Sequence, residues 1–328
     1  MKFLLLFFLL NASSVANSQD VNNEISKSNK KFIKIVSRII KEKSLFTGFL
    51  DWKHIPNELK RLPFRNIDSI DRNLVLNYFI TSLKSVGDNH SLFVTQATIK
   101  TLTSDSSVAT LSESKYLGSG IGYIKVPKCM TFDKVKDREY ANSIRSQIRR
   151  LDIENDIVGW VIDLRNNNGG NMWPMVAGLN ALMYDGTIGY LIGANGKKHK
   201  DWKTVNGTIN YSKETIDLYK VKKMNPKIAV LVNSKTASSG EMTAISLLGL
   251  PNVKSFGQPT AGFTTTNSTF YFPNGTQLFL ASHYVADQKF KLYPERIRPD
   301  VIMNTPNTFN DDEILEYSKK WILEDDDR

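Results

Sequence analysis

The sequence predicts an α/β protein whose core is built of βα units around a mostly parallel sheet, preceded by a small helical N-terminal domain. Two near-continuous apolar segments, residues 157–164 and 227–233, are each followed by a helical pattern. This alternation is typical of parallel strands that are covered by helices on both faces. The chain has 328 residues, 41% of them hydrophobic and 23% charged, which indicates a globular protein of two or three domains.

The N-terminus has the pattern of a secretory signal peptide. Lys2 precedes the apolar run of residues 3–10, and a small-residue stretch follows it up to Gln19. Eight apolar residues are too few to cross a bilayer core of about 30 Å as a helix. We therefore expect residues 1–18 to be a signal peptide and the mature protein to be secreted, periplasmic or bound to the cell envelope.

Residues 19–105 predict the helical N-terminal domain. Apolar residues recur at helical spacing between residues 24 and 45, with lysines on the other face, and a second helical pattern covers residues 72–85. The chain carries 43 Lys and Arg against 33 Asp and Glu, a formal charge of +10. We expect the first helix to pack on its own domain; peripheral contact with an anionic membrane surface is the alternative.

The core is predicted over residues 106–310. Its elements follow in order as strands within 116–126, a helix at 132–151, a strand at 157–164, a helix at 172–183, a strand at 227–233, a helix from 238 to about 249 and a β-hairpin within 270–280. Residues 184–226 are polar and aromatic, interrupt this rhythm and are expected to form an insertion or cap. Residues 311–328 are expected to form a last helix and an acidic tail.

Cysteine usage excludes several kinds of site. Cys129 is the single cysteine, so an intramolecular disulfide, a cysteine-rich zinc site and an iron–sulfur cluster are ruled out. No histidine lies near Cys129 in the sequence, which favours a small core or edge residue over a nucleophile.

Two strand-to-helix junctions have the composition of a catalytic site. In residues 163–170 two glycines, Gly169 and Gly170, follow a buried strand and precede a helix, where N–H groups stabilise anions. Neither a Walker loop nor a G-x-G-x-x-G pattern is present. In residues 233–242 a cluster of small residues joins a strand to a helix, a geometry that can present a serine at the carboxyl end of a sheet.

Together with residues 257–262 and 87–90, these two junctions resemble the S41 serine peptidases, which include the C-terminal processing proteases and the tricorn protease core. Adding residues 262–267 makes the chain most similar to the nisin-resistance branch of the family. The resemblance implies a ClpP/crotonase-like core and a serine endopeptidase that cleaves peptides near their C-termini. It implies a peptide or protein substrate, lantibiotic-type or other exported peptides among them, with no cofactor, no metal and no nucleic acid.

The same resemblance implies the nucleophile and the oxyanion hole. The nucleophile is Ser238, the serine three residues before Glu241. Ser239 is expected to supply a backbone N–H to the oxyanion hole, together with Gly169 or Gly170 from the other junction. Donors aimed at a developing oxyanion lower the barrier by a few kcal/mol each.

The residue expected as general base is not the lysine that the processing proteases of this family use. Processing proteases use a lysine at the position that corresponds to 263, where this sequence has phenylalanine. His90 matches the histidine of the tricorn-like and nisin-resistance branches, and its neutral form near pH 7 can accept the serine proton. His199 is expected in a solvated turn and His283 packed in a strand, while Lys235 is the remaining lysine candidate.

A third residue should orient the imidazole, and the sequence leaves three acids for this role. Glu295 roughly matches the tricorn glutamate and is the first choice, with Asp88 and Glu241 as rivals. Two other hypotheses for the whole chain remain open. One is an inactive homologue that binds peptide ends, and the other is a basic protein that binds the cell envelope through its helical domain.

Overall fold

The computed structural model describes residues 25–105, 112–130, 133–205, 208–209, 219–303 and 311–324. The expected signal peptide lies outside the described residues, as do residues 325–328 of the acidic tail. The described residues form two compact units, one of residues 25–38 and 51–79 and the other of residues 39–50 and the described residues from 80 onward. Residues 80–105, which the sequence assigned to the helical domain, group with the second unit. No described helix is long and apolar enough to cross a membrane.

The first unit is helical. It contains α2 (Ile55–Lys60) and most of α1 (Lys27–Lys43) and α3 (Asp68–Ser85). Phe32 and Val36 of α1 are buried, while the α1 lysines are exposed, so the apolar face of this helix is covered by the chain itself. A buried hydrogen bond of 2.6 Å from Asn29 Nδ2 to Asp71 Oδ2 ties α1 to α3.

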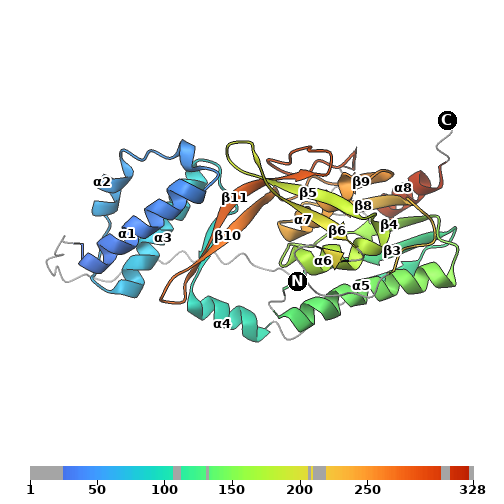
Figure 1. The fold of residues 1–328 in the computed structure, drawn as a ribbon, viewed down its shortest axis with the longest axis horizontal. Helices are drawn as coiled ribbons and strands as arrows, with labels where there is room; N and C mark the ends of the chain where they lie inside the picture. Colours follow the sequence, from blue (N-terminus) through green and yellow to red (C-terminus); the bar gives the residue numbers. More distant parts are fainter. Residues whose placement is uncertain are drawn as a thin grey trace. The chain divides into compact units, whose positions relative to one another are not determined.

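The larger unit contains the mostly parallel sheet that the sequence predicts. Its six strands run in the order β12 (Val301–Ile302), β9 (Val253–Gly257), β8 (Lys227–Val232), β4 (Gly159–Asp163), β3 (Ile121–Lys125) and β2 (Glu113–Tyr116). Every neighbouring pair is parallel except β2 with β3. The predicted α/β fold class is confirmed by this sheet, which is drawn in Figure 1.

A second, antiparallel sheet completes this unit. It consists of β1 (Leu92–Val94), β11 (Gln277–Asp287), β5 (Gly186–Ile192), β6 (Lys198–Val205) and β7 (Thr208–Ile209), with β10 (Thr265–Tyr271) paired to β11. The predicted hairpin corresponds to β10 and β11. The described part of residues 184–226, expected as an insertion or cap, supplies β5, β6 and β7 to this sheet.

Helices α6 (Met172–Leu179) and α7 (Ser239–Leu248) contact the antiparallel sheet, and α5 (Lys134–Glu154) packs beside α6 on strands β2 and β3 of the parallel sheet. Helix α8 (Asp311–Leu323) covers the other face of the parallel sheet. Two short 3-10 turns, Thr47–Phe49 and Asn180–Leu182, and helix α4 (Gln96–Asp105) complete the described elements. Successive side chains of β4 point to opposite faces of the parallel sheet. Trp160 and Ile162 therefore pack on the face covered by α5, α6 and α7, and Val161 packs on the face covered by α8. The buried Cys129 belongs to the central core.

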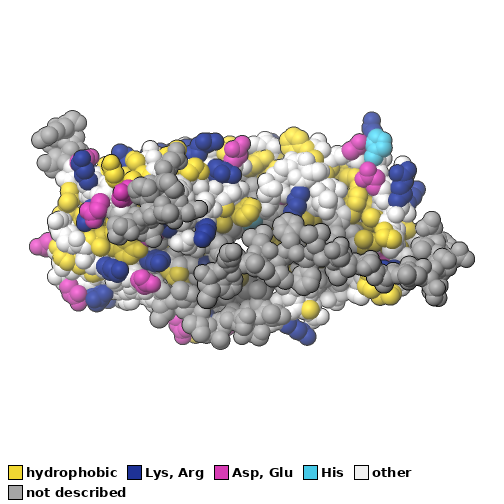
Figure 2. Space-filling view, turned by 180° about the vertical axis from the view of Figure 1, so that it is seen from behind, with side chains coloured by type: hydrophobic (Ala, Val, Ile, Leu, Met, Phe, Trp, Pro, Cys, Tyr) yellow, Lys and Arg dark blue, Asp and Glu magenta, His cyan; other side chains and the backbone are white. Residues whose placement is uncertain are grey.

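One face of the molecule shows charged side chains of both signs. On the face shown in Figure 2, Lys and Arg side chains are scattered among Asp and Glu. The net positive charge is therefore not concentrated in a single basic patch among the described residues of that face.

Candidate active site

The nucleophile candidate occupies a strained turn between β8 and α7. Ser238 has φ 51° and ψ −120°, a backbone conformation that a non-glycine residue rarely adopts and that costs on the order of 1–3 kcal/mol. The turn is held by the carboxylate of Glu241, which accepts the Ser238 N–H at 2.9 Å, and by the Met242 N–H, which donates to the Ser238 carbonyl at 2.9 Å. Such a strand–turn–helix elbow exposes the serine hydroxyl beyond the carboxyl end of the sheet.

The glycine junction between β4 and α6 contacts this elbow directly. The Ala237 N–H donates to the Asn167 carbonyl at 2.9 Å, and the Ser239 hydroxyl donates to the Gly170 carbonyl at 2.5 Å. Gly170 has φ +109°, and a Cβ placed on it would lie 2.0 Å from the Cys129 carbonyl oxygen. Glycine is therefore required here both by the positive φ and by the close approach of another backbone.

Two backbone N–H groups are available beside Ser238. The N–H of Gly169 already donates to Oδ1 of Asn167 at 3.0 Å. Within the described part of the chain the N–H groups of Gly170 and Ser239 have no acceptor. The geometry therefore favours Gly170 over Gly169, a choice that the sequence left open, as the partner of Ser239 in an oxyanion hole.

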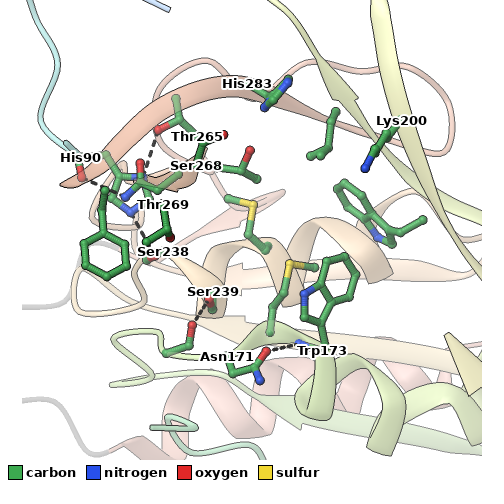
Figure 3. A pocket seen from close by; sticks show the side chains of 18 of the residues that line it. His90, Asn171, Trp173, Lys200, Ser238, Ser239, Thr265, Ser268, Thr269 and His283 are labelled. Atoms are coloured by element: carbon green, nitrogen blue, oxygen red, sulfur yellow. Dashed lines mark hydrogen bonds between the residues drawn. The ribbon is translucent and has the colours of Figure 1, made fainter. Parts of the chain in front are cut away.

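His90 lies against Ser238. Its Nε2 is 3.0 Å from Ser238 Oγ and its Nδ1 is 3.0 Å from Thr265 Oγ1, as Figure 3 shows. The turn after α3 places the residue, because the Asp88 carboxylate accepts the His90 N–H at 3.0 Å. The ring of Phe263 stacks on the imidazole, with ring centroids 5.5 Å apart and planes inclined by 15°.

The environment of His90 favours its neutral form. Burial lowers the pKa of His90 below its usual range, and the nearby negative charge of Asp88 opposes that effect only in part. A neutral imidazole whose Nδ1–H donates to Thr265 has an unprotonated Nε2 facing the Ser238 hydroxyl. This is the protonation state that a general base requires.

None of the three described acids considered for the third role contacts the imidazole ring. The side chain of Glu295 is exposed, and its backbone carbonyl accepts the Thr264 hydroxyl. Asp88 accepts from backbone N–H groups and from the Ser91 hydroxyl. Glu241 is turned toward Ser238 and the loop at 260–263. The hydroxyl of Thr265, which the sequence did not suggest, takes the place expected for Glu295.

The lysine alternative has no geometric support. Phe263 occupies the position of the family lysine and packs on His90. Lys235 is exposed on the turn before Ser238. A lysine base must be held neutral by burial, which an exposed side chain does not experience.

Ser238 and His90 open into a cavity of about 490 Å³ in the larger unit. One wall is polar and is formed by residues 265–269 of β10. The opposite side is apolar and contains Trp173 and Trp202, whose rings meet edge to face. His199 and His283 also line the cavity, and His199 lies in β6 rather than in the expected turn. Among the described residues no group of three or more His, Cys, Asp or Glu side chains is arranged to hold a metal ion.

Comparison with known proteins places this site in a family. Residues 120–303 match peptidase family S41. The chain is 30% identical to the nisin-resistance protein of Lactococcus lactis over 285 residues, which is 85% of each chain. It is 26% identical to the carboxy-terminal processing protease CtpA of Bacillus subtilis over 59% of this chain and 37% of that protein. The chain therefore belongs to peptidase family S41.

Solved structures support the same fold. A lipoprotein from Streptococcus agalactiae aligns with a TM-score of 0.73 and 27% identity, covering 91% of this chain and 97% of that one. The photosystem II D1 C-terminal processing protease aligns with a TM-score of 0.58 over 85% of this chain and 94% of that one, at 12% identity, which is a likeness of fold alone. The predicted family and the predicted fold class are both confirmed.

Proposed function

We propose that this chain is a serine endopeptidase in which Ser238 is the nucleophile and His90 the general base. The observation that carries the proposal is the 3.0 Å contact between Nε2 of His90 and Oγ of Ser238 at a strained strand-to-helix turn. Membership of a peptidase family supports it independently.

The geometry supports a complete acyl-transfer cycle. Neutral His90 takes the Ser238 proton as Oγ attacks the peptide carbonyl, and the resulting oxyanion accepts hydrogen bonds from the N–H groups of Ser239 and Gly170. The imidazolium then gives its proton to the leaving amine, and water hydrolyses the acyl-enzyme with His90 again as base. The Thr265 hydroxyl is placed to accept the Nδ1–H of His90, and the negative charge of Asp88 stabilises the imidazolium.

We further propose that the substrates are exported peptides, lantibiotic-type peptides among them, and that cleavage falls near their C-termini. The support is the likeness to proteins described as a nisin-resistance protein and a carboxy-terminal processing protease. Export of this chain is supported by its N-terminal pattern and by the likeness to a lipoprotein. Mass spectrometry of the products formed from nisin and from a library of secreted peptides tests both statements.

A fluorophosphonate probe tests the nucleophile, because only an activated serine reacts with it. We expect the wild type to be labelled, Ser238→Ala to be unlabelled and Ser239→Ala to be labelled about three- to tenfold more slowly. The slower rate follows from loss of the hydrogen bond between the Ser239 hydroxyl and the Gly170 carbonyl. An unlabelled wild type indicates an inactive homologue, and labelling of Ser238→Ala but not Ser239→Ala places the nucleophile at 239.

A further inference from the structure

The cavity beside Ser238 has a one-sided charge composition. Its described lining contains three histidines and one lysine, His90, His199, His283 and Lys200, and no Asp or Glu. His90 serves Ser238, so the other three side chains have no part in the proposed reaction. Lys200 carries a positive charge that no carboxylate of this lining offsets, so the cavity favours an anionic group.

His199 and His283 form a pair on the cavity wall. Their rings stack with centroids 4.5 Å apart and planes inclined by 28°. Nδ1 of His283 lies 3.0 Å from the Ser282 hydroxyl, and in the described structure its Nε2 has no hydrogen-bond partner. The ring nitrogens of His199 likewise have none there. His199 is exposed and His283 is partly buried, so both rings keep a nitrogen that can bind a group entering the cavity.

The surroundings of this pair are positively charged. Burial lowers the pKa of His283, and electrostatic repulsion from His199, Lys200 and Lys43 lowers it further. Lys200 belongs to β6 and lines the same cavity, and Figure 3 labels it together with His283. A bound anion relieves the repulsion among these groups and gains charge-assisted hydrogen bonds.

The position of the pair connects it to the reacting atoms. His283 on β11 is the cross-strand partner of Thr266 on β10, and Thr265, the residue before Thr266, contacts His90. A peptide held along residues 265–269 with its scissile bond at Ser238 therefore passes within a few residues of the histidine pair. Apolar side chains of such a peptide face Trp173 and Trp202.

We propose that His199, His283 and Lys200 form a subsite that binds a carboxylate of the peptide substrate. Carboxylates are the anionic groups that peptides carry, as the free C-terminal carboxylate or as Asp and Glu side chains. The proposal deepens the peptidase function proposed above and rests on it. It also predicts that a substrate with only positive charges near the cleavage point is a poor one.

The test uses an eight-residue random peptide library with a fluorogenic cleavage readout, prepared as free acids and as C-terminal amides. We expect the wild type to cleave the free acids with a kcat/KM about five- to tenfold higher than the amides. In His199→Gln/His283→Gln and in Lys200→Met the ratio of acid to amide kcat/KM should fall to about one, because the variants lose the groups that bind the carboxylate. Lys197→Met removes a neighbouring charge outside the cavity lining and should keep the wild-type ratio.

A second set of amidated peptides, each with one Asp or Glu at a defined position, distinguishes the two sources of the carboxylate. A preference for free acids alone assigns the α-carboxylate, and a gain from internal Asp or Glu assigns a side chain. Equal cleavage of all peptides, or a preference that the three substitutions leave unchanged, overturns the subsite. Absence of cleavage overturns the proposed peptidase instead. The subsite is then tested by fluorescence polarisation of the same labelled peptides on Ser238→Ala, where equal affinities for acids and amides overturn it.

Discussion

At the scale of single residues, the imidazole of His90 decides the chemistry. We expect His90→Ala to lose nearly all peptidase activity, about 10³-fold or more in kcat/KM, and Lys235→Met to retain most of it. The reason is the contact of His90 with Ser238, compared with the exposed side chain of Lys235. Steady-state cleavage of a fluorogenic peptide measures both variants. An inactive Lys235→Met beside an active His90→Ala contradicts this mechanism.

The same residue sets the pH dependence. The base works only when neutral, so kcat/KM falls as pH drops through the pKa of His90. Because burial lowers that pKa, the acid limb should lie below the range of an ordinary histidine, about 6.5. Activity at pH 6 therefore remains higher than an unperturbed histidine base would allow.

Phe263 is the residue that holds this environment in place. Phe263→Ala removes the ring that stacks on His90 and opens the imidazole to water. We expect kcat to fall about tenfold with little change in KM, as the base loses its orientation. Reduced burial also raises the pKa of His90, so the acid limb moves to higher pH. Phe49→Ala, at an exposed ring, is the control. An unchanged pH profile in Phe263→Ala argues against this role.

At the scale of elements, the elbow before α7 depends on a single buried carboxylate. Glu241 accepts from the N–H groups of Ser238, Gly262 and Phe263 and from the Thr260 hydroxyl, and it is fully buried. It therefore joins the strained turn of the nucleophile to the loop that carries Phe263. Burial raises the pKa of Glu241, while its hydrogen bonds counteract that effect.

Glu241→Gln tests this coupling. One side-chain oxygen becomes an NH₂ group that faces backbone donors, so buried N–H groups lose their acceptor. We expect the free energy of unfolding to fall by about 2–4 kcal/mol and kcat to fall at least tenfold. Urea titration and peptide cleavage measure the two effects, with exposed Glu42→Gln as the matched control. Wild-type stability in Glu241→Gln contradicts the structural role.

The sequence was sufficient to predict some parts of the site but not others. The two junctions were predictable because each follows an apolar strand and carries glycines or small residues that only a few turns require. Thr265 was not, since it lies 175 residues from His90 and has no local signature among many threonines. The contact depends on the pairing of β10 with β11 and on the bulge after Thr266. Such register is fixed by packing of the whole sheet.

At the scale of the whole molecule, the strands β5 and β6 of the second sheet were likewise not predicted from the sequence. Residues 184–205 are polar and aromatic because β5 and β6 cover the buried helices with one face and expose the other. Trp202 is buried in the core, while Asp201 and Lys203 on either side of it are only partly buried. This pattern resembles an irregular insertion when neighbouring strands are unknown. The pairing partner, β11, lies far along the chain.

The division into two units leads to a prediction about the molecule as a whole. All residues of the cavity belong to the second unit, whereas Asp71 belongs to the first. Asp71 is buried and accepts from Asn29 Nδ2 at 2.6 Å and from the Arg65 N–H at 2.9 Å.

Asp71→Ala leaves both donors without this acceptor and should destabilise the first unit by about 2–4 kcal/mol. Hydrogen exchange should therefore accelerate in residues 25–38 and 51–79. Labelling of Ser238 by a fluorophosphonate should keep its wild-type rate, because stability is not uniform across a structure and this unit contributes no group to the site. A labelling rate that falls together with the protection of the first unit would show instead that the site depends on both units.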